Sequence, residues 1–281
     1  MRTLFRSVML ACGVFAAVAV SAEVLDLNGV DKTVTALTEL DGYEGVTNSS
    51  DTPAKLTFAL SDTWNENETY AGVLAGNLSV VKENKGTLAL SAANTYTGGT
   101  VINKGKLQAD NAQAFGPINA ELPIQVNADL NGEDVSATSD QSTAVLINVA
   151  TFDYPINCAE WTNHGERSKG TRGSGTLYNI AVITGAAATL NGKITGGDVA
   201  IHDGKLDKWA NNSTAGGNLT VNGEIDVGDG ALSLMARAST FHLKAKVCAG
   251  AIYHPTTSDW PTNTKLYSPD NVIGLIDCGR R

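Results

Sequence analysis

The stretch LSAANTYTGGTVINKGKLQA, residues 90–109, sets a run of polar and very small residues, 91–100, between two short apolar segments. Such a run is compatible with a loop of an enzyme or with a corner in a repeating structure. Internal repetition separates these two possibilities, because a solenoid reuses one structural unit along the chain. We therefore searched the rest of the sequence for related units.

The unit that contains the Gly-Gly pair of this stretch recurs in the second half of the chain. Its three copies are TGGTVINKGKLQA (97–109), TGGDVAIHDGKLD (195–207) and AGGNLTVNGEIDV (215–227). A short β-branched or leucine-containing run follows the glycine pair in each copy. Because the same local sequence favours the same turn, we expect the three glycine pairs to occupy equivalent corners: Gly98 and Gly99, Gly196 and Gly197, and Gly216 and Gly217.

Two shorter units also recur. One is GTLAL (86–90), GTLYN (175–179) and GALSL (230–234). The other ends in Asn-Gly, as DLNG (26–29), DLNG (129–132), TLNG (189–192) and TVNG (220–223). Together, these imperfect repeats indicate a repetitive architecture.

Each repeated unit has the pattern of a short strand. Leu88 alternates with Leu90, and Leu219 with Val221, which is the period of two of a half-buried strand. The strands end at Gly-Gly or Asn-Gly, which tolerate positive φ and permit tight corners. The pattern predicts an all-β fold, a right-handed β-solenoid (β-helix) of short strands with glycine-rich corners. An up-and-down barrel or sandwich is the alternative, with longer and less similar strands.

Composition restricts the class of protein. Hydrophobic residues make up 42% of the 281 residues and charged residues 17%, so the chain has enough apolar residues for a core. The formal net charge of −9 opposes binding to a phosphate backbone, and we expect no nucleic-acid partner.

The amino-terminal segment 1–22 has the order of a signal peptide. Arg2 and Arg6 precede an apolar run over 8–20, and small residues end the segment before Glu23. A lipid anchor at Cys12 is the less favoured reading. We expect an exported protein, at the cell surface, outside the cell or in the periplasm, with no transmembrane segment in the mature chain.

Export permits disulfide bonds among the three cysteines that follow the signal peptide. Cys248 with Cys278 is the favoured pair, and the sequence leaves the pairing with Cys158 open. No C-x-x-C motif indicates a zinc site.

Residues 90–109 resemble the autotransporter passenger-associated repeat, whose signature is leucine-serine-glycine-alanine-asparagine-threonine-tyrosine-threonine-glycine-glycine. Ala92 stands where that family usually has glycine. The resemblance extends from 24 to 132 and implies a β-helical passenger of a bacterial surface or secreted protein, with a repeat that aids translocation and folding. Its structural positions here are Asn94, Thr95, Tyr96, Thr97, Gly98 and Gly99.

The resemblance also suggests a division of the chain. We expect a signal peptide over 1–22, a β-solenoid with the repeat over 23–132, and degenerate rungs over 133–247 with an insertion near 153–175. Residues 248–281 are expected to be an irregular segment. Such passengers usually precede a membrane β-barrel, and no such series of strands follows here, so the sequence leaves open a different release route or a fragment of a longer protein.

Candidate residues for chemistry are few. The spacing of Gly99, Gly105 and Lys106 lacks the pattern of a phosphate-binding loop. Asp198, His202 and Asp203 form the one acid–histidine group and are weak candidates for a metal site. Alternation along a strand would send some of these side chains to opposite faces, so we expect no metal, cofactor or catalytic residue.

Sequence alone therefore predicts a non-enzymatic scaffold or an adhesin-like, surface-interacting passenger. Its expected partners are surface glycans, or proteins of a host or neighbouring cell. The alternative is a β-helical lyase or hydrolase acting on polysaccharides, which would need clustered carboxylates on one face of adjacent rungs.

Overall fold

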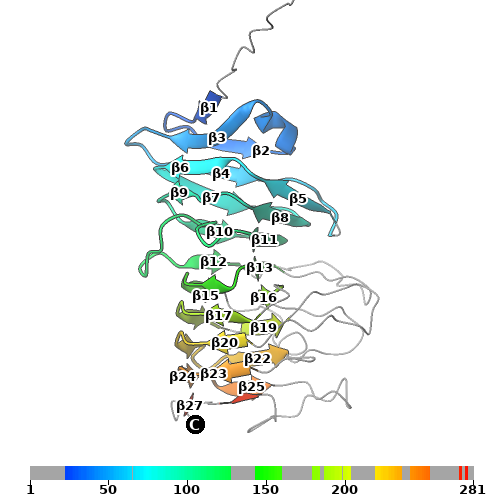
Figure 1. Cartoon of the computed structure of the whole chain (residues 1–281), viewed down its shortest axis with the longest axis vertical. Coiled ribbons are helices and arrows are strands. Elements are labelled where there is room, and N and C mark those ends of the chain that lie inside the picture. The colour runs from blue at the N-terminus through cyan, green and yellow to red at the C-terminus, as the bar shows by residue number, and fades with distance from the viewer. Residues whose placement is uncertain are drawn as a thin grey trace, which may run out of the picture.

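The computed structural model describes residues 23–64, 66–127, 143–159, 179–183, 187–197, 199–203, 219–235, 241–253, 272–273 and 276–277. These residues form parallel strands that are stacked along one axis (Figure 1). The expected signal peptide, 1–22, lies outside the described residues and stays a prediction.

Four parallel sheets contain all the described strands. Sheet A has the strands β1 (Glu23–Asp26), β3 (Tyr43–Asn48), β6 (Val73–Gly76) and β9 (Thr95–Tyr96). Sheet B has β2 (Lys32–Val34), β4 (Ala54–Phe58), β7 (Leu78–Lys82), β10 (Thr100–Ile102), β12 (Ile124–Val126), β15 (Ile156–Cys158), β18 (Ile194–Gly196), β21 (Ile225–Asp226), β24 (Lys246–Cys248) and β27 (Ile276–Asp277).

Sheet C has β5 (Asn67–Tyr70), β8 (Thr87–Leu90), β11 (Lys106–Ala109), β13 (Ala144–Ile147), β16 (Ile180–Val182), β19 (Val199–Asp203), β22 (Ala231–Met235) and β25 (Ala251–Tyr253). Sheet D has β14 (Thr151–Phe152), β17 (Ala188–Leu190), β20 (Leu219–Val221), β23 (Phe241–Leu243) and β26 (Val272–Ile273). The described residues also contain one short 3₁₀-helix, η1 (Leu37–Leu40).

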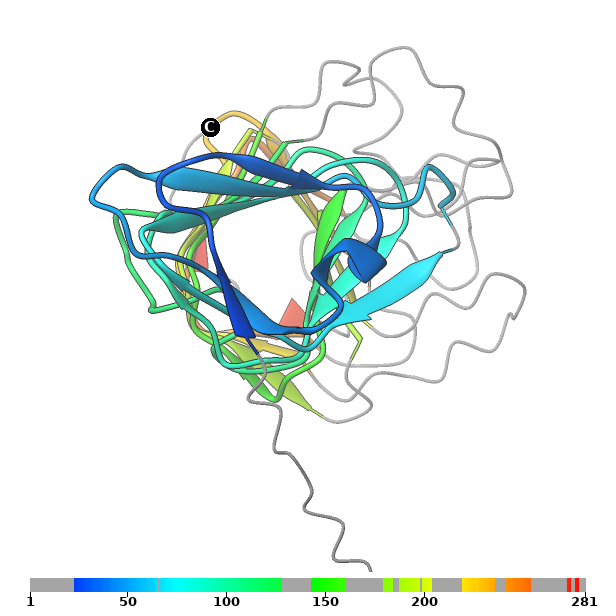
Figure 2. The same ribbon diagram turned by 90° about the horizontal axis from the view of Figure 1, so that it is seen from above.

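The order in which the chain visits these sheets defines a solenoid. It runs through A, B and C in the amino-terminal part and through D, B and C in the carboxyl-terminal part. Seen along the axis, the rungs enclose a roughly triangular interior (Figure 2). This arrangement confirms the predicted all-β solenoid, and sheet D takes the place in the rung that sheet A has in the earlier part.

Aliphatic side chains stacked from rung to rung build the core. In sheet C, Leu88 pairs with Leu107, which pairs with Val145 and then Ile180, and all four are fully buried. Each strand thus buries its inward residues on the next rung, which removes apolar surface from water without long strands.

An aromatic cluster fills the interior where sheet A ends and sheet D begins. No strand forms over 110–123, and Phe115, Phe152 and Tyr154 pack with ring centroids 5.2 to 6.0 Å apart. The Tyr154 hydroxyl donates a hydrogen bond to the Gly116 carbonyl, at 2.6 Å. These three large rings therefore fill the interior of a rung that lacks a strand over 110–123.

Of the three kinds of repeated unit, two have copies at equivalent positions in the rung. The Asn-Gly pairs 28–29, 191–192 and 222–223 all follow a strand of sheet A or D and precede one of sheet B. GTLAL and GALSL both lead into strands of sheet C. The copies at 129–132 and 175–178 lie outside the described residues.

The expected equivalence of the glycine pairs is wrong. Gly98 and Gly99 lie between sheets A and B, whereas Gly196 ends β18 of sheet B and Gly197 leads toward sheet C. Gly216 and Gly217 lie outside the described residues. A glycine pair permits a corner, but the stacking of the adjoining strands decides which corner of the rung it forms.

Two expected boundaries also need correction. Strand β15 lies inside the insertion expected near 153–175, so the start of that segment is part of a regular rung. Strands β25, β26 and β27 lie in the segment 248–281, which was expected to be irregular, and they continue sheets C, D and B. Sheets B and C both run past the proposed division at 132.

Candidate functional site

The run 91–100 that separates two apolar segments forms two successive corners of one rung. It leaves β8 of sheet C, passes through β9 of sheet A and enters β10 of sheet B. Of its two possible interpretations, loop of an enzyme or corner of a solenoid, the structure supports the corner.

Asn94 joins this corner to the rungs on both sides. Its side-chain oxygen accepts a hydrogen bond from the backbone N–H of Leu74, at 2.9 Å, and its side-chain amide donates to the carbonyl of Ala114, at 2.6 Å. Its own backbone N–H donates to the carbonyl of Gln113, at 2.9 Å. Because Asn94 is only 2% exposed, water cannot replace these bonds.

Tyr96 fills the interior behind the corner. It is 1% exposed, and its hydroxyl lies 2.6 Å from the hydroxyl of Thr100, which is also buried. Burial raises the pKa of the Tyr96 phenol, and the hydrogen bond with Thr100 opposes that shift in part. The neutral hydroxyl is therefore satisfied inside an apolar core.

Gly98 and Gly99 make the turn into sheet B possible, each for its own reason. A Cβ on Gly98 would lie 2.7 Å from the Leu78 carbonyl oxygen, so the preceding rung leaves no space for a side chain. Gly99 has φ +85°, a left-handed conformation that glycine adopts without strain. Beside them, Thr97 donates from its hydroxyl to the Gly76 carbonyl, at 3.3 Å, whereas the Thr95 side chain is exposed.

Two further buried polar residues, in different sheets, were not expected from the sequence. Asn48 is 1% exposed; its amide donates to the carbonyls of Thr52 and Asn77, and its oxygen accepts from the N–H of Gly29. Lys82 is also 1% exposed, at the end of β7. Neither belongs to a recognisable motif, and only the neighbouring rungs show that both are inside.

The weak metal candidates gain no support. Asp198 lies outside the described residues, and His202 and Asp203 are in β19, in register with Ala181 and Val182 of the preceding rung. Over the part of the chain that the structure describes, no group of three or more histidine, cysteine, aspartate or glutamate residues is placed to hold a metal ion. The expectation that these residues hold no metal stays untested.

The two described cysteines have different states. Cys158 is a buried free thiol, and burial raises its pKa. Cys248 is disulfide-bonded, and its partner lies outside the described residues. This is compatible with the favoured pairing of Cys248 with Cys278, which stays a prediction.

The fold and the corner define the class of protein: a parallel β-solenoid whose rungs are joined by buried amide side chains. The family model described as the passenger-associated-transport-repeat matches residues 80–109, which include both corners. This segment thus carries the passenger-associated repeat that the sequence resemblance predicted.

A comparison with curated proteins finds one from Brucella suis biovar 1 (strain 1330), described as "Adhesin BmaC autotransporter". The two are 28% identical over 171 residues, which cover 56% of this chain and 5% of that protein. The chain therefore spans a small part of the relative's length. No solved structure matches the chain. Among the described residues, no helix has the length and apolar character needed to cross a membrane.

Proposed function

We propose that this chain is a non-enzymatic segment of an exported, adhesin-like passenger, whose solenoid carries a surface that binds other cells. The observation that supports it best is the structural role of the repeat residues. Asn94 and Tyr96 are buried, Gly98 lies directly against the Leu78 backbone, and all three serve the stacking of rungs. Such a motif builds a scaffold, and the similarity to a protein described as an adhesin supports a role in surface interaction.

The repeat aids translocation and folding in this proposal. Asn94 bonds to backbone groups of the preceding and following rungs, so a completed corner offers hydrogen-bonding groups to the next rung. Folding can then proceed rung by rung, as in other solenoids, without contacts between distant parts of the chain.

The partners in this proposal are glycans or proteins on a host or neighbouring cell. Such a partner would bind the outer faces, where amide and hydroxyl side chains form connected arrays. One array on the outside of sheet B links Gln125 to Asn157 at 2.7 Å and Asn157 to Thr195 at 2.9 Å. Amides and hydroxyls in such positions suit hydroxyl-rich or peptide partners.

Export through cleavage after residue 22 belongs to the same proposal and places the protein at the cell surface, outside the cell or in the periplasm. The order of basic, apolar and small residues over 1–22 supports it. Expression of residues 1–281 in a bacterium should give a mature protein that begins at Glu23, measured by amino-terminal sequencing of the exported fraction. Retention of residues 1–22 would contradict this part.

Binding is tested with labelled mature protein, residues 23–281, applied to cultured host cells, to bacterial cells and to a glycan array. We expect saturable binding to at least one of these surfaces and no shortening of common polysaccharides. The control is the same protein unfolded by heat, which should not bind. Polysaccharide cleavage would favour the enzymatic alternative, and absence of binding to all three surfaces would overturn the adhesin-like function.

A further inference from the structure

Lys82 occupies a core position that is otherwise apolar. In sheet B it pairs with Phe58 on one side and Ile102 on the other, both fully buried. The same column continues to Val34 above and Val126 below. A lysine is almost never fully buried without partners, so this position needs an explanation.

Backbone carbonyl oxygens surround the ammonium group. Lys82 Nζ donates to the carbonyls of Glu83, Asn84 and Lys85, at 2.6, 2.8 and 3.0 Å. A fourth carbonyl, that of Lys104 in the next rung, lies at 3.4 Å. The carbonyls come from the corners that lead from sheet B to sheet C in two successive rungs, so the ammonium connects both corners.

The backbone of these two corners is shaped to form a closed cage. Asn84 has φ +59°, and Gly86 and Gly105 have φ +73° and +70°. A Cβ on Gly105 would lie 2.5 Å from the Asn84 carbonyl oxygen and 3.0 Å from Lys82 Nζ, so glycine is required in the wall of the cage.

The chemistry of the cage is that of a cation site. Hard cations in proteins take oxygen ligands, among them backbone carbonyls, and an ammonium offers three N–H donors to the same groups. Burial lowers the pKa of Lys82 to about 8, and the nearby Glu83 and Glu68 oppose this shift. The amine is therefore mostly protonated at neutral pH.

We propose that these two corners form a monovalent-cation site whose built-in occupant is the ammonium of Lys82, and that this cation fixes the corners relative to each other. Lys82 connects the two rungs near the start of the family match, 80–109, with no need for a free metal ion. This inference concerns the assembly of the scaffold and does not depend on the proposed adhesin-like function.

The proposal is tested by a substitution that removes the charge of Lys82 but keeps most of its side-chain length. Methionine in Lys82→Met is one heavy atom shorter than lysine and leaves the carbonyls facing a gap of about ammonium size. Thermal unfolding of the mature chain is measured in chloride salts of ammonium, potassium and tetramethylammonium at equal ionic strength. We expect the melting temperature of Lys82→Met to fall by about 10 °C in tetramethylammonium and to recover at least half of that loss in ammonium or potassium.

The matched control is Lys55→Met on β4 of the same sheet, where the lysine side chain is 52% exposed. Neither this variant nor the unmodified protein should distinguish the three salts. An unchanged melting temperature of Lys82→Met, or an equal loss in all three salts, including failure to fold in ammonium, would overturn the cation site.

A second measurement uses the unmodified protein. In ¹⁵N NMR spectra near neutral pH, the Lys82 ammonium should give a signal that exchanges slowly with water, distinct from those of exposed lysines such as Lys55. An Nζ signal of Lys82 in fast exchange with water would also overturn the proposal.

Discussion

Buried asparagine side chains hold the rungs together in both parts of the solenoid, and the carboxyl-terminal part adds an exposed set. In the rungs with sheet A, Asn48 and Asn94 are buried and bond to backbone groups of neighbouring rungs. In the rungs with sheet D, the buried Asn179 likewise accepts a hydrogen bond from the Ala200 N–H, at 2.9 Å. A second set is exposed there: Asn191 donates to Asp153 at 2.6 Å and Asn222 donates to Asn191 at 2.8 Å.

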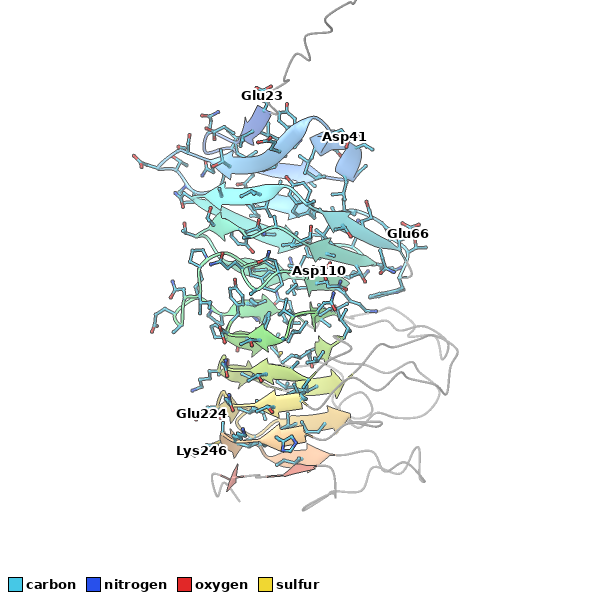
Figure 3. All side chains as sticks on the ribbon, viewed as in Figure 1. Glu23, Asp41, Glu66, Asp110, Glu224 and Lys246 are labelled. Carbon is cyan, nitrogen blue, oxygen red and sulfur yellow. The ribbon has the colours of Figure 1, made fainter. Side chains whose placement is uncertain are left out.

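Asp110 marks the transition between these two parts, at the end of β11 (Figure 3). It accepts hydrogen bonds from Gln108 at 2.6 Å and from Asn148 of the following rung at 2.8 Å. Further along the axis, Lys193 and Glu224 form an exposed ion pair at 3.7 Å. Past residue 109, exposed links between rungs thus stand beside buried ones such as those of Tyr154 and Asn179.

The comparison shows that the location of an amide decides its energetic role. Loss of a buried amide leaves backbone donors and acceptors without partners in an interior that water does not reach. Loss of an exposed amide exposes its partner to water, which replaces the bond. The buried amides therefore fix the conformation of single corners. Each bond of the exposed ladder, which runs from Asn222 to Asn191 to Asp153, adds only a small increment to the free energy of unfolding.

The largest effect is expected for the buried amide of the repeat. Asn94→Ala leaves the Leu74 N–H and the Ala114 carbonyl without partners and should lower the free energy of unfolding by about 3 kcal/mol. The matched variant Asn191→Ala should lower it by about 0.5 kcal/mol. Urea unfolding followed by circular dichroism measures both, and equal losses would contradict the distinction between buried and exposed amides.

The corner glycine should give the next largest effect. Gly98→Ala places a Cβ against the Leu78 backbone and should cost about 2 kcal/mol, because neither rung can move away without loss of its strand pairing. In Gly42→Ala the added Cβ meets no atom within 4 Å, and only the left-handed φ of +90° costs about 1 kcal/mol. Thermal unfolding compares the two, and a smaller loss for Gly98→Ala would show that the repeat corner is not tightly packed.

Two of the buried tyrosines, Tyr96 and Tyr70, should respond in opposite directions. Tyr96→Phe removes a hydrogen bond to Thr100 and should lower the free energy of unfolding by about 1 kcal/mol. The Tyr70 hydroxyl is buried without a hydrogen-bond partner, so Tyr70→Phe should leave stability unchanged or raise it by about 1 kcal/mol. Destabilisation by both substitutions would indicate an additional partner for Tyr70.

The dependence of stability on alkaline pH also tests Tyr70, with a smaller expected effect. Burial raises the pKa of Tyr70 to about 12 from an ordinary value of 10. Between these values the unfolded chain releases the phenol proton while the folded chain keeps it, so stability falls as pH rises through this window. The pH dependence of the melting temperature from 9 to 11 should be weaker in Tyr70→Phe, and an unchanged dependence would exclude this contribution.

The smallest effect is expected at the end of the exposed ladder. Asn222→Ala removes one bond to Asn191 and should change the free energy of unfolding by less than about 0.5 kcal/mol. The same unfolding experiment measures it. A loss comparable with that of Asn94→Ala would mean that the exposed ladder is as important as the buried amides.

Much of the scaffold could be predicted from local sequence. The alternation in GTLAL and GALSL predicts strands, and both units do lead into sheet C. The run 91–100 could be interpreted as a corner. The positions of the glycine pairs could not be predicted, because Gly98 and Gly196 share a local sequence but lie at different corners of the rung.

By itself, the sequence determined the short strands, the glycine-rich corners and the family of the repeat, because these depend on backbone conformations and apolar alternation within a few residues. Only the tertiary structure decided that Asn94 bonds to two other rungs, that Lys82 lies inside a cage of carbonyls, and that sheet D replaces sheet A. The bonds of Asn94, the contact of Lys82 with the Lys104 carbonyl and the pairing of sheet D all join residues about twenty or more positions apart, which meet only when the rungs stack.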